Sequence, residues 1–454
     1  MPFSSLPAFL ATCFSRLATA LDPRSAARLP ALLIGLLLAR GRRTCASWFR
    51  ACGVTDDFRR AYNVIGSCGR RADWVAVRLL PAVDPLLAGD RLVVAFDDTP
   101  TSRWGPRVGG AGVHHNPKSG PAGEKFVYGH VWVTLAAPAR HPGRGTIALP
   151  PRSEMYVRDK DIERLDPDRR PPFRTKLEMA AELLGWVMTW RGWRFKEVWA
   201  VVDGGYPKRP FLRAARERGV VVVGRLPADA ALRGLPDQPA PARRGRKPVY
   251  GKKKVVPKMR AGQLRGWDEV SCRQCGRRVT KWVKTSLATW RPAGGLIRVV
   301  LVQEGHGWRA YFCTKATATA EEVLEAVADR TAIEQTFKDV KETWGAGQQQ
   351  VRNLHANVGA STSVPGCTAW SRRGLGLSRK RSWWAGKTAR GTGSTAGRLT
   401  RTSARRCSAN SCAGKSKRPW QIGLASSNSA NWPNACFAWL LEHHGSRRVQ
   451  CEPC

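Results

Sequence analysis

The sequence predicts an α/β protein, because two short apolar runs each end in acidic residues. Residues 91–96 (RLVVAF) run into Asp97-Asp98, and residues 197–202 (EVWAVV) run into Asp203. Both runs have the length and composition of buried strands. A helical stretch and a further strand-like run follow the second acid, at 210–218 and 220–224. This order is typical of an α/β sheet with its site at the strand ends, although each acid alone has the alternative role of a turn residue or helix cap.

A third observation is the stretch 329–353, which reads DRTAIEQTFKDVKETWGAGQQQVRN. On a helix at about 100° per residue, Arg330, Glu334 and Lys341 fall within an arc of roughly 40°. An apolar stripe lies beside that face, formed by Ile333, Phe337, Val340 and Trp344. A carboxylate at the edge of a buried stripe suits a metal ligand. The alternative is an ordinary surface helix with i,i+4 ion pairs.

The size and charge of the chain indicate a large protein that binds nucleic acid. Its 454 residues suffice for two or three domains, and its formal net charge is +42. So large an excess predicts a polyanionic partner, DNA or RNA first. The longest apolar run, 29–39, is about half a membrane span, and the N-terminus lacks the charged region of a secretory signal. We therefore expect a cytoplasmic protein without membrane contact, at the nucleoid in a bacterium.

Changes in periodicity divide the chain into five parts. We expect a helical DNA-binding part at 1–90 and the first portion of the core at 91–227. A basic linker with a β-rich insertion follows at 228–318, then the core helix with Glu334 at 319–358 and a basic tail, frameshifted or disordered, at 359–454. In the first part, a helical pattern, Gly41 and a second helix capped by Thr44 suggest a helix-turn-helix, with plain helical packing as the alternative. The CxxC pair Cys272 and Cys275 is expected in a turn between strands rather than at a metal.

Acids on two strand ends and one helix suggest metal-dependent phosphodiester chemistry. The candidates are Asp97, with Asp98 as the alternative first acid, Asp203 and Glu334, separated by 106 and 131 residues. Two divalent cations about 3.5–4 Å apart activate the nucleophile and stabilise the leaving oxygen in such cleavage. Mg²⁺ prefers carboxylate, water and phosphate oxygens, so two aspartates and a glutamate suffice.

The residues around these acids resemble the DDE transposases of bacterial insertion sequences, cut-and-paste enzymes with an RNase H-like core. The resemblance covers about residues 25–358. It is carried by VVAFDDTPTSRWGPRVGGAGVHHNP and VVDGGYPKRPFL, around Asp97 and Asp203, and by Arg330, Glu334 and Lys341. The last group follows the family's tyrosine-arginine-glutamate-lysine spacing, with Val327 at the tyrosine position.

The resemblance implies a fold and a set of roles. The fold is an RNase H-like core with a β-rich insertion and an N-terminal helical DNA-binding domain. Asp97, Asp203 and Glu334 would hold two Mg²⁺ or Mn²⁺ ions, Arg330 and Lys341 would contact DNA phosphates, and Tyr206 would position the site. The partners would be double-stranded transposon ends and target DNA, bound by a homodimer. Trp282 or Trp290 would stack on an extruded base, with core packing as the alternative.

The end of the chain changes character. From His355 to Cys454 there are 16 Lys and Arg, two acids, six cysteines and six tryptophans, without helical periodicity. We expect a frameshift near residue 360, and a disordered basic tail is the alternative. Besides an active transposase, two other functions stay open: an inactive DNA-binding remnant and an RNase H-like repair nuclease.

Overall fold

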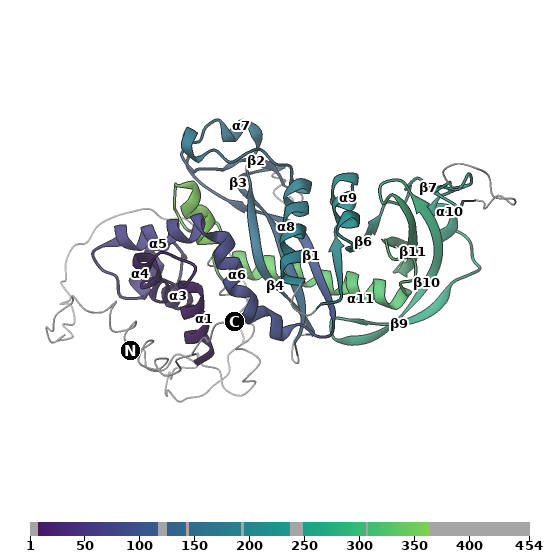
Figure 1. The fold of residues 1–454 in the computed structure, drawn as a ribbon, viewed down its shortest axis with the longest axis horizontal. Helices are drawn as coiled ribbons and strands as arrows, with labels where there is room; N and C mark the ends of the chain where they lie inside the picture. Colours follow the sequence, from purple (N-terminus) through teal and green to yellow (C-terminus); the bar gives the residue numbers. More distant parts are fainter. Residues whose placement is uncertain are drawn as a thin grey trace, which may run out of the picture.

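The computed structural model describes residues 8–116, 125–141, 145–191, 195–236, 248–305 and 307–362. Within these residues, all twelve strands join one mixed sheet. Figure 1 shows an elongated molecule with the N-terminal helices at one end and the strands of the second half of the chain at the other. The expected α/β class is confirmed in this form, a large sheet with helices on its faces.

Six strands from the first half of the chain form one half of the sheet. They are β1 (Arg91–Ser102), β2 (Gly112–His115), β3 (Phe126–His141), β4 (Gly145–Tyr156), β5 (Glu197–Val202) and β6 (Val221–Leu226). Their order is β2-β3-β1-β5-β6, and β4 also pairs with β3. β5 pairs in parallel with both β1 and β6, whereas β3 is antiparallel to β1.

β1 is longer than the sequence predicts, so the first acids lie inside the strand rather than after it. From Arg91 to Phe96 it pairs with β5, and from Ala95 to Ser102 it pairs with β3. The apolar pattern stops at Phe96, but the ladder to β3 continues through the acids and satisfies their backbone groups. Asp97 therefore lies where the parallel pairing with β5 ends.

Six more strands continue the sheet beyond β6. They are β7 (Leu232–Arg233), β8 (Lys254–Val255), β9 (Asp268–Gln274), β10 (Arg277–Trp290), β11 (Gly295–Glu304) and β12 (Gly307–Cys313), with the short helix α10 (Pro257–Ala261) among them. β12 pairs with β6, so the expected β-rich insertion extends the core sheet and is not a separate unit. Between β9 and β10, Cys275 and Gly276 have φ of 49° and 82°, the two-residue hairpin turn expected for the CxxC pair.

Helices cover the two faces of the sheet. α8 (Lys176–Arg191) and α9 (Arg209–Glu217) pack on one face, and α11 (Ala320–Arg330) and α12 (Ala332–Glu342) pack on the other. Between β4 and α8 the chain forms two short helices, α7 (Asp159–Ile162) and η3 (Pro167–Arg169). In β1, Val94 and Phe96 belong to the first core, whereas Ala95 packs against Ile333 of α12. This is the alternation that a strand imposes on its side chains.

The stretch expected as one helix from residue 329 is divided. α11 ends at Arg330 and α12 begins at Ala332. The hydroxyl of Thr331 donates to the carbonyl oxygen of Ala328, and the backbone switches to i,i+3 hydrogen bonds on both sides of it. A threonine that binds a preceding carbonyl in this way bends or interrupts a helix. Gly345, with φ of 66°, follows α12, as expected for a C-terminal glycine.

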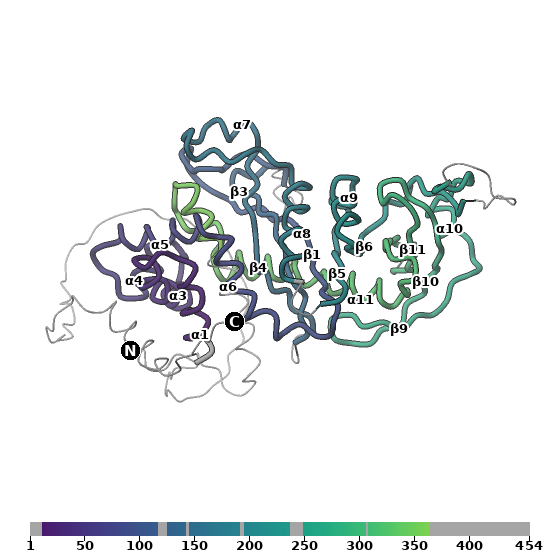
Figure 2. Tube along the Cα trace, viewed as in Figure 1, coloured from purple at the N-terminus to yellow at the C-terminus, as the bar shows by residue number. Residues whose placement is uncertain are grey.

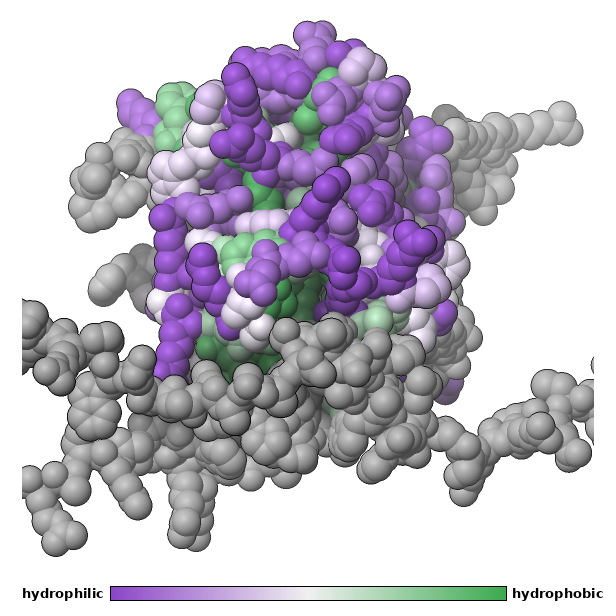
Figure 3. All heavy atoms as spheres, turned by 90° about the vertical axis from the view of Figure 1, so that its left-hand side faces the viewer, coloured by the Kyte–Doolittle hydropathy of each residue, from purple (hydrophilic) through white to green (hydrophobic). Residues whose placement is uncertain are grey.

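The first part of the chain is helical, as predicted. Its helices are α1 (Ala8–Ala18), α2 (Pro23–Ala26), α3 (Leu29–Leu38), α4 (Cys45–Ala51), α5 (Phe58–Arg70), α6 (Ala72–Val83) and η2 (Asp84–Leu86). Thr44 caps α4 by accepting a hydrogen bond from the Ser47 amide. In α4, Cys45, Trp48 and Phe49 are buried, whereas Arg50 is exposed. The surface at this end of the molecule is mostly hydrophilic (Figure 3).

A helix at 354–362 ends the described part of the chain and docks on α5 (Figure 2). The two helices approach through glycines: a Cβ at Gly69 would lie 1.7 Å from the His355 carbonyl oxygen, and one at Gly359 would lie 1.8 Å from that of Ile65. Residues 359–362 therefore belong to the folded part and not to the tail. The frameshifted or disordered tail that we expect lies otherwise outside the described residues. Among those residues no helix is long and apolar enough to span a membrane.

Candidate active site

Asp97 and Asp203 are brought together by the register of two parallel strands. Phe96 of β1 pairs with Val202, the last residue of β5, and each aspartate is the next residue along the chain. Neighbouring strands lie about 4.8 Å apart, so two acids separated by 106 residues in the sequence become neighbours at one sheet edge.

The doublet Asp97-Asp98 is divided between the two faces of the sheet. Asp97 points toward α11 and α12, where its Oδ2 accepts a hydrogen bond from Arg330 at 3.0 Å. Asp98 points toward α8, where Lys176 Nζ lies 2.7 Å from its Oδ2 and Tyr206 donates to its Oδ1 at 3.1 Å. Asp97 is therefore on the same face as α12, whereas Asp98 is held by two partners on the opposite face.

The guanidinium of Arg330 is the common partner of three acids. Besides Asp97, its Nη2 lies 3.4 Å from Asp203 Oδ1 and 4.0 Å from Glu334 Oε1. The Arg330 side chain is 12% exposed, Asp97 19%, and Asp203 and Glu334 52% each. Arg330 ends α11 and Glu334 lies in the first turn of α12, so the junction of the two helices brings both to the strand ends.

Burial raises the pKa values of two groups at this site, Asp97 and Tyr206. Desolvation raises the pKa of Asp97 to about 6, although Arg330 and the amide of Asp98 lower it in part. The neighbouring charges of Asp98 and Asp203 add to the rise. On the other face, desolvation and the nearby aspartates raise the pKa of Tyr206 well above its usual value, so its hydroxyl stays a hydrogen-bond donor. Ionisation of Asp97 is therefore unfavourable in this buried position, and additional positive charge nearby would favour it.

The acids have the chemistry of a divalent-cation site but are not arranged as one. In the described residues, no group of three or more His, Cys, Asp or Glu is placed to hold a metal ion. Three carboxylates nevertheless meet around one cationic group, and carboxylate oxygens are the donors that Mg²⁺ and Mn²⁺ prefer. These residue types fit such an ion, and in this structure the guanidinium of Arg330 supplies the positive charge between them.

The other residues singled out from the sequence lie further from this cluster. Lys341 is half-buried in the last turn of α12. Trp290 is buried with its ring 5.0 Å from that of Phe312, which is core packing, whereas Trp282 is 48% exposed. Lys176, the partner of Asp98, was not identified from the sequence. No local sequence pattern marks this lysine, because it meets Asp98 only when α8 packs beside β1.

The mixed sheet with its cluster of acids fits the fold of a DDE nuclease. A family model described as DDE superfamily endonuclease matches residues 13–291, more than half of the chain. The chain belongs to the DDE superfamily endonucleases, which confirms the resemblance seen in the sequence. A search of curated proteins finds no match. The matched range includes Asp97 and Asp203 but ends before Glu334.

Proposed function

We propose that this DDE superfamily endonuclease is a transposase that binds transposon terminal repeats, cleaves DNA strands and transfers the freed 3′ ends to target DNA. The observation that carries the proposal is the convergence of Asp97, Asp203 and Glu334 on Arg330, within 3.0, 3.4 and 4.0 Å. A net charge of +42 supports a DNA partner. We take the core to be RNase H-like and the N-terminal helices to be a DNA-binding domain.

In this proposal the three acids hold divalent cations, Mg²⁺ or Mn²⁺. Such ions supply a Lewis acid for the phosphate and lower the pKa of bound water. Lys176 and Tyr206 hold the side chain of Asp98 on one face of the sheet. Because side chains alternate along β1, Asp97 then points to the opposite face. Arg330 offsets part of the negative charge of the acids, and together with Lys341 it pairs with DNA phosphates in the complex.

The proposal includes an oligomeric state and a cellular location. The enzyme acts on double-stranded DNA as a homodimer in the bacterial cytoplasm, at the nucleoid. A repair nuclease with the same core would cut according to DNA structure and would not need the terminal repeat. An inactive remnant would bind the repeat without cutting it.

The test is cleavage of labelled DNA that carries the element's terminal repeat, with Mg²⁺ or with EDTA. We expect metal-dependent nicking at the repeat boundary by the full chain. Asp203→Asn and Glu334→Gln should each reduce cleavage at least about a hundredfold, because each removes a carboxylate from the cation site, whereas DNA binding persists.

Glu342→Gln is the matched control. It removes a carboxylate from the same helix, but Glu342 is 66% exposed and its partner at 4.0 Å is Lys338. Wild-type cleavage by Glu334→Gln, or cutting that does not depend on the repeat, would contradict the proposal.

A further inference from the structure

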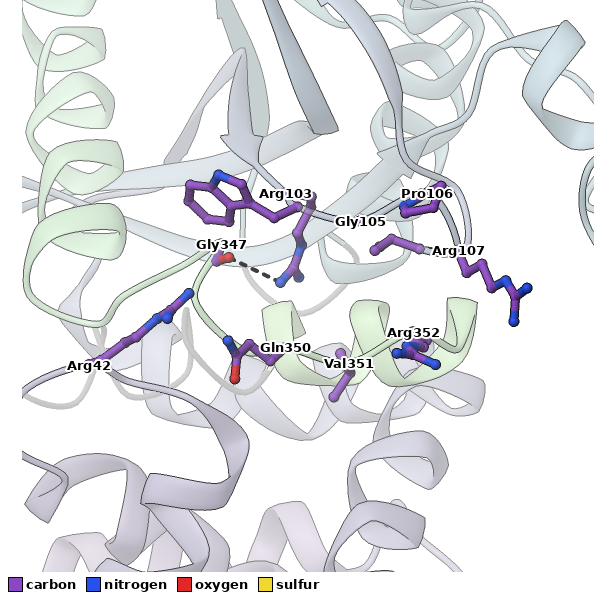
Figure 4. Close-up of a pocket in the computed structure, with 11 residues that line it drawn as sticks. Arg42, Arg103, Gly105, Pro106, Arg107, Gly347, Gln350, Val351 and Arg352 are labelled. Atoms are coloured by element: carbon purple, nitrogen blue, oxygen red, sulfur yellow. Dashed lines mark hydrogen bonds between the residues drawn. The ribbon is translucent and has the colours of Figure 1, made fainter.

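A second concave site lies beyond the end of β1, away from the acids. It is a pocket of about 560 Å³, within the range of small-molecule sites. Three segments that are far apart in the sequence form it: Arg42 between α3 and α4, residues 103–108 after β1, and residues 347–352 after α12. Figure 4 shows Arg42 reaching toward Gly347 and Arg107 extending outward at the rim.

The lining of this pocket is strongly basic. It contains four arginines and no acid: Arg42, Arg103, Arg107 and Arg352. Arg42, Arg107 and Arg352 are exposed, and none of them forms an ion pair within the part of the chain that the structure describes. Positive charge concentrated in a concavity without internal counter-charge attracts an anion, and planar guanidinium groups match the geometry of phosphate.

An exposed aromatic ring lies among these arginines. Trp104 is 69% exposed, more than any other tryptophan in the described residues. A single exposed tryptophan is common on protein surfaces, so what distinguishes Trp104 is its place in the lining of this basic pocket. A tryptophan beside basic groups is the combination that binds unpaired nucleotides, because the ring stacks on a base while the cations pair with the backbone.

The pocket is rigidly built on its inner side. Arg103 is buried, and it donates from Nε to His130 Nδ1 at 3.2 Å and from Nη1 to the Gly347 carbonyl oxygen at 3.2 Å. His130 Nε2 lies 3.0 Å from the Gly109 carbonyl oxygen, to which it donates because Nδ1 is the acceptor. Burial and Arg103 lower the pKa of His130 to about 3, which keeps the ring neutral and the network intact.

The opposite wall has a strained backbone. Gln350 has φ of 51°, a left-handed conformation that is unfavourable for a non-glycine residue. The side chain of Gln349 holds the loop, since it accepts from the Gly347 amide at 2.8 Å and donates to the Gly345 carbonyl oxygen at 3.0 Å. Such strain persists where the surrounding structure enforces it, commonly at ligand sites.

We propose that this pocket binds an unpaired nucleotide of the DNA on which the enzyme acts, with its phosphates on Arg42, Arg107 and Arg352 and its base on Trp104. The inference rests on the proposed function for the identity of the nucleic acid. A single-stranded segment fits better than a duplex, because bases within a duplex are stacked on each other and offer no free face to Trp104. DNA with a frayed or overhanging end beside the cut supplies such a nucleotide.

The test is the affinity of the full chain in EDTA for two fluorescent duplexes, one blunt and one with a short single-stranded overhang, at several salt concentrations. We expect tighter binding of the overhang by the wild type. Trp104→Ala should weaken overhang binding about tenfold without changing its salt dependence, the effect of one lost base stack. Arg107→Ala/Arg352→Ala should lower the slope of log K against log salt by about 1.4, for two lost contacts to a single strand.

Matched controls separate this site from general electrostatics. Arg216→Ala/Arg218→Ala removes the same charge from exposed positions at the end of α9, and Trp74→Ala removes a tryptophan that is 57% exposed. Pocket variants that behave like these controls, or a Trp104→Ala protein with unchanged overhang preference, would overturn the inference. Since the assay involves no cleavage, it is independent of the catalytic test. A chain that cuts repeats but has a pocket indifferent to overhangs refutes this inference alone, whereas pocket-dependent binding without any cutting refutes the proposed activity alone.

Discussion

Strand β1 carries two polar sites that compensate charge in opposite ways. At its middle, Asp97 shares the guanidinium of Arg330 with Asp203 and Glu334, so three negative charges meet one positive charge. Beyond its end, the basic pocket has no acid in its lining. The first site therefore has an excess of negative charge, and the second has an excess of positive charge. A DNA strand accompanied by divalent cations supplies the opposite charge to both, so the two sites have complementary needs that one substrate satisfies.

The largest effect on stability is expected from Arg330→Met. Without the guanidinium, three carboxylates face each other, and the metal-free protein should lose on the order of 2–3 kcal/mol of unfolding free energy. The loss is smaller than for a fully buried pair because Asp203 and Glu334 are half exposed. Urea unfolding with and without Mn²⁺ measures this, and Mn²⁺ should stabilise the variant more than the wild type.

Arg309→Met is the control for this change, since Arg309 forms an exposed pair with Glu304 at 2.9 Å and should contribute less than about 1 kcal/mol. Equal stability of Arg330→Met and wild type would show that the acids are not electrostatically coupled through Arg330.

A smaller effect of opposite sign is expected from Asp97→Asn. The pKa of Asp97 is raised to about 6, so between about pH 4 and pH 6 the folded protein binds more protons than the unfolded chain, and its stability falls as pH rises. The variant should therefore be more stable than wild type at pH 7 and above, by about 1–2 kcal/mol. This is less than the pKa change alone corresponds to, because Arg330 loses an ionic partner.

Thermal unfolding from pH 3.5 to 8 checks this prediction, and the difference from wild type should vanish below about pH 4. Asp90→Asn, at an exposed position, should show no such trend. A difference that grows toward low pH would contradict the assignment of the raised pKa to Asp97.

The smallest effect is expected in the basic pocket. Arg107→Ala/Arg352→Ala removes two exposed cations without ion-pair partners in the described chain, so the unfolding free energy should change by less than about 0.5 kcal/mol. Urea unfolding of this variant beside Arg330→Met gives the contrast directly. If the unfolding free energy fell as much as it does for Arg330→Met, these arginines would stabilise the fold and would not be reserved for binding a ligand.

The sequence predicted those elements whose structure depends on adjacent residues, such as buried strands, helix caps and tight turns. The apolar run that became β5 was predicted with its bounds, because the cores on both faces of the sheet bury its side chains from Val198 to Val202. The Thr44 cap and the turn at Cys275 were equally visible, since each depends only on adjacent residues. Asp97 and Asp203 were singled out because an acid directly after a buried strand is conspicuous.

What the sequence did not reveal depends on partners far along the chain. The second half of β1 is a strand because β3 pairs with it, and no local pattern shows a partner about 35 residues away. The orientation of Arg330 toward Asp97 and Asp203 arises from the packing of α11 and α12 on the face of the sheet. The basic pocket joins three segments separated by up to about 300 residues, none of which is distinctive alone.

The continuity of β1 sets a fixed length scale for the protein. Asp97 and Arg103 are separated by six residues of extended chain, which at about 3.3 Å per residue amounts to roughly 20 Å. In the proposed function, a DNA strand held at both places would span about six nucleotides between them, at roughly 3.4 Å of rise for each. Because the ladder to β3 holds β1 extended from Ala95 to Ser102, the proposed interval would be the same for every DNA substrate.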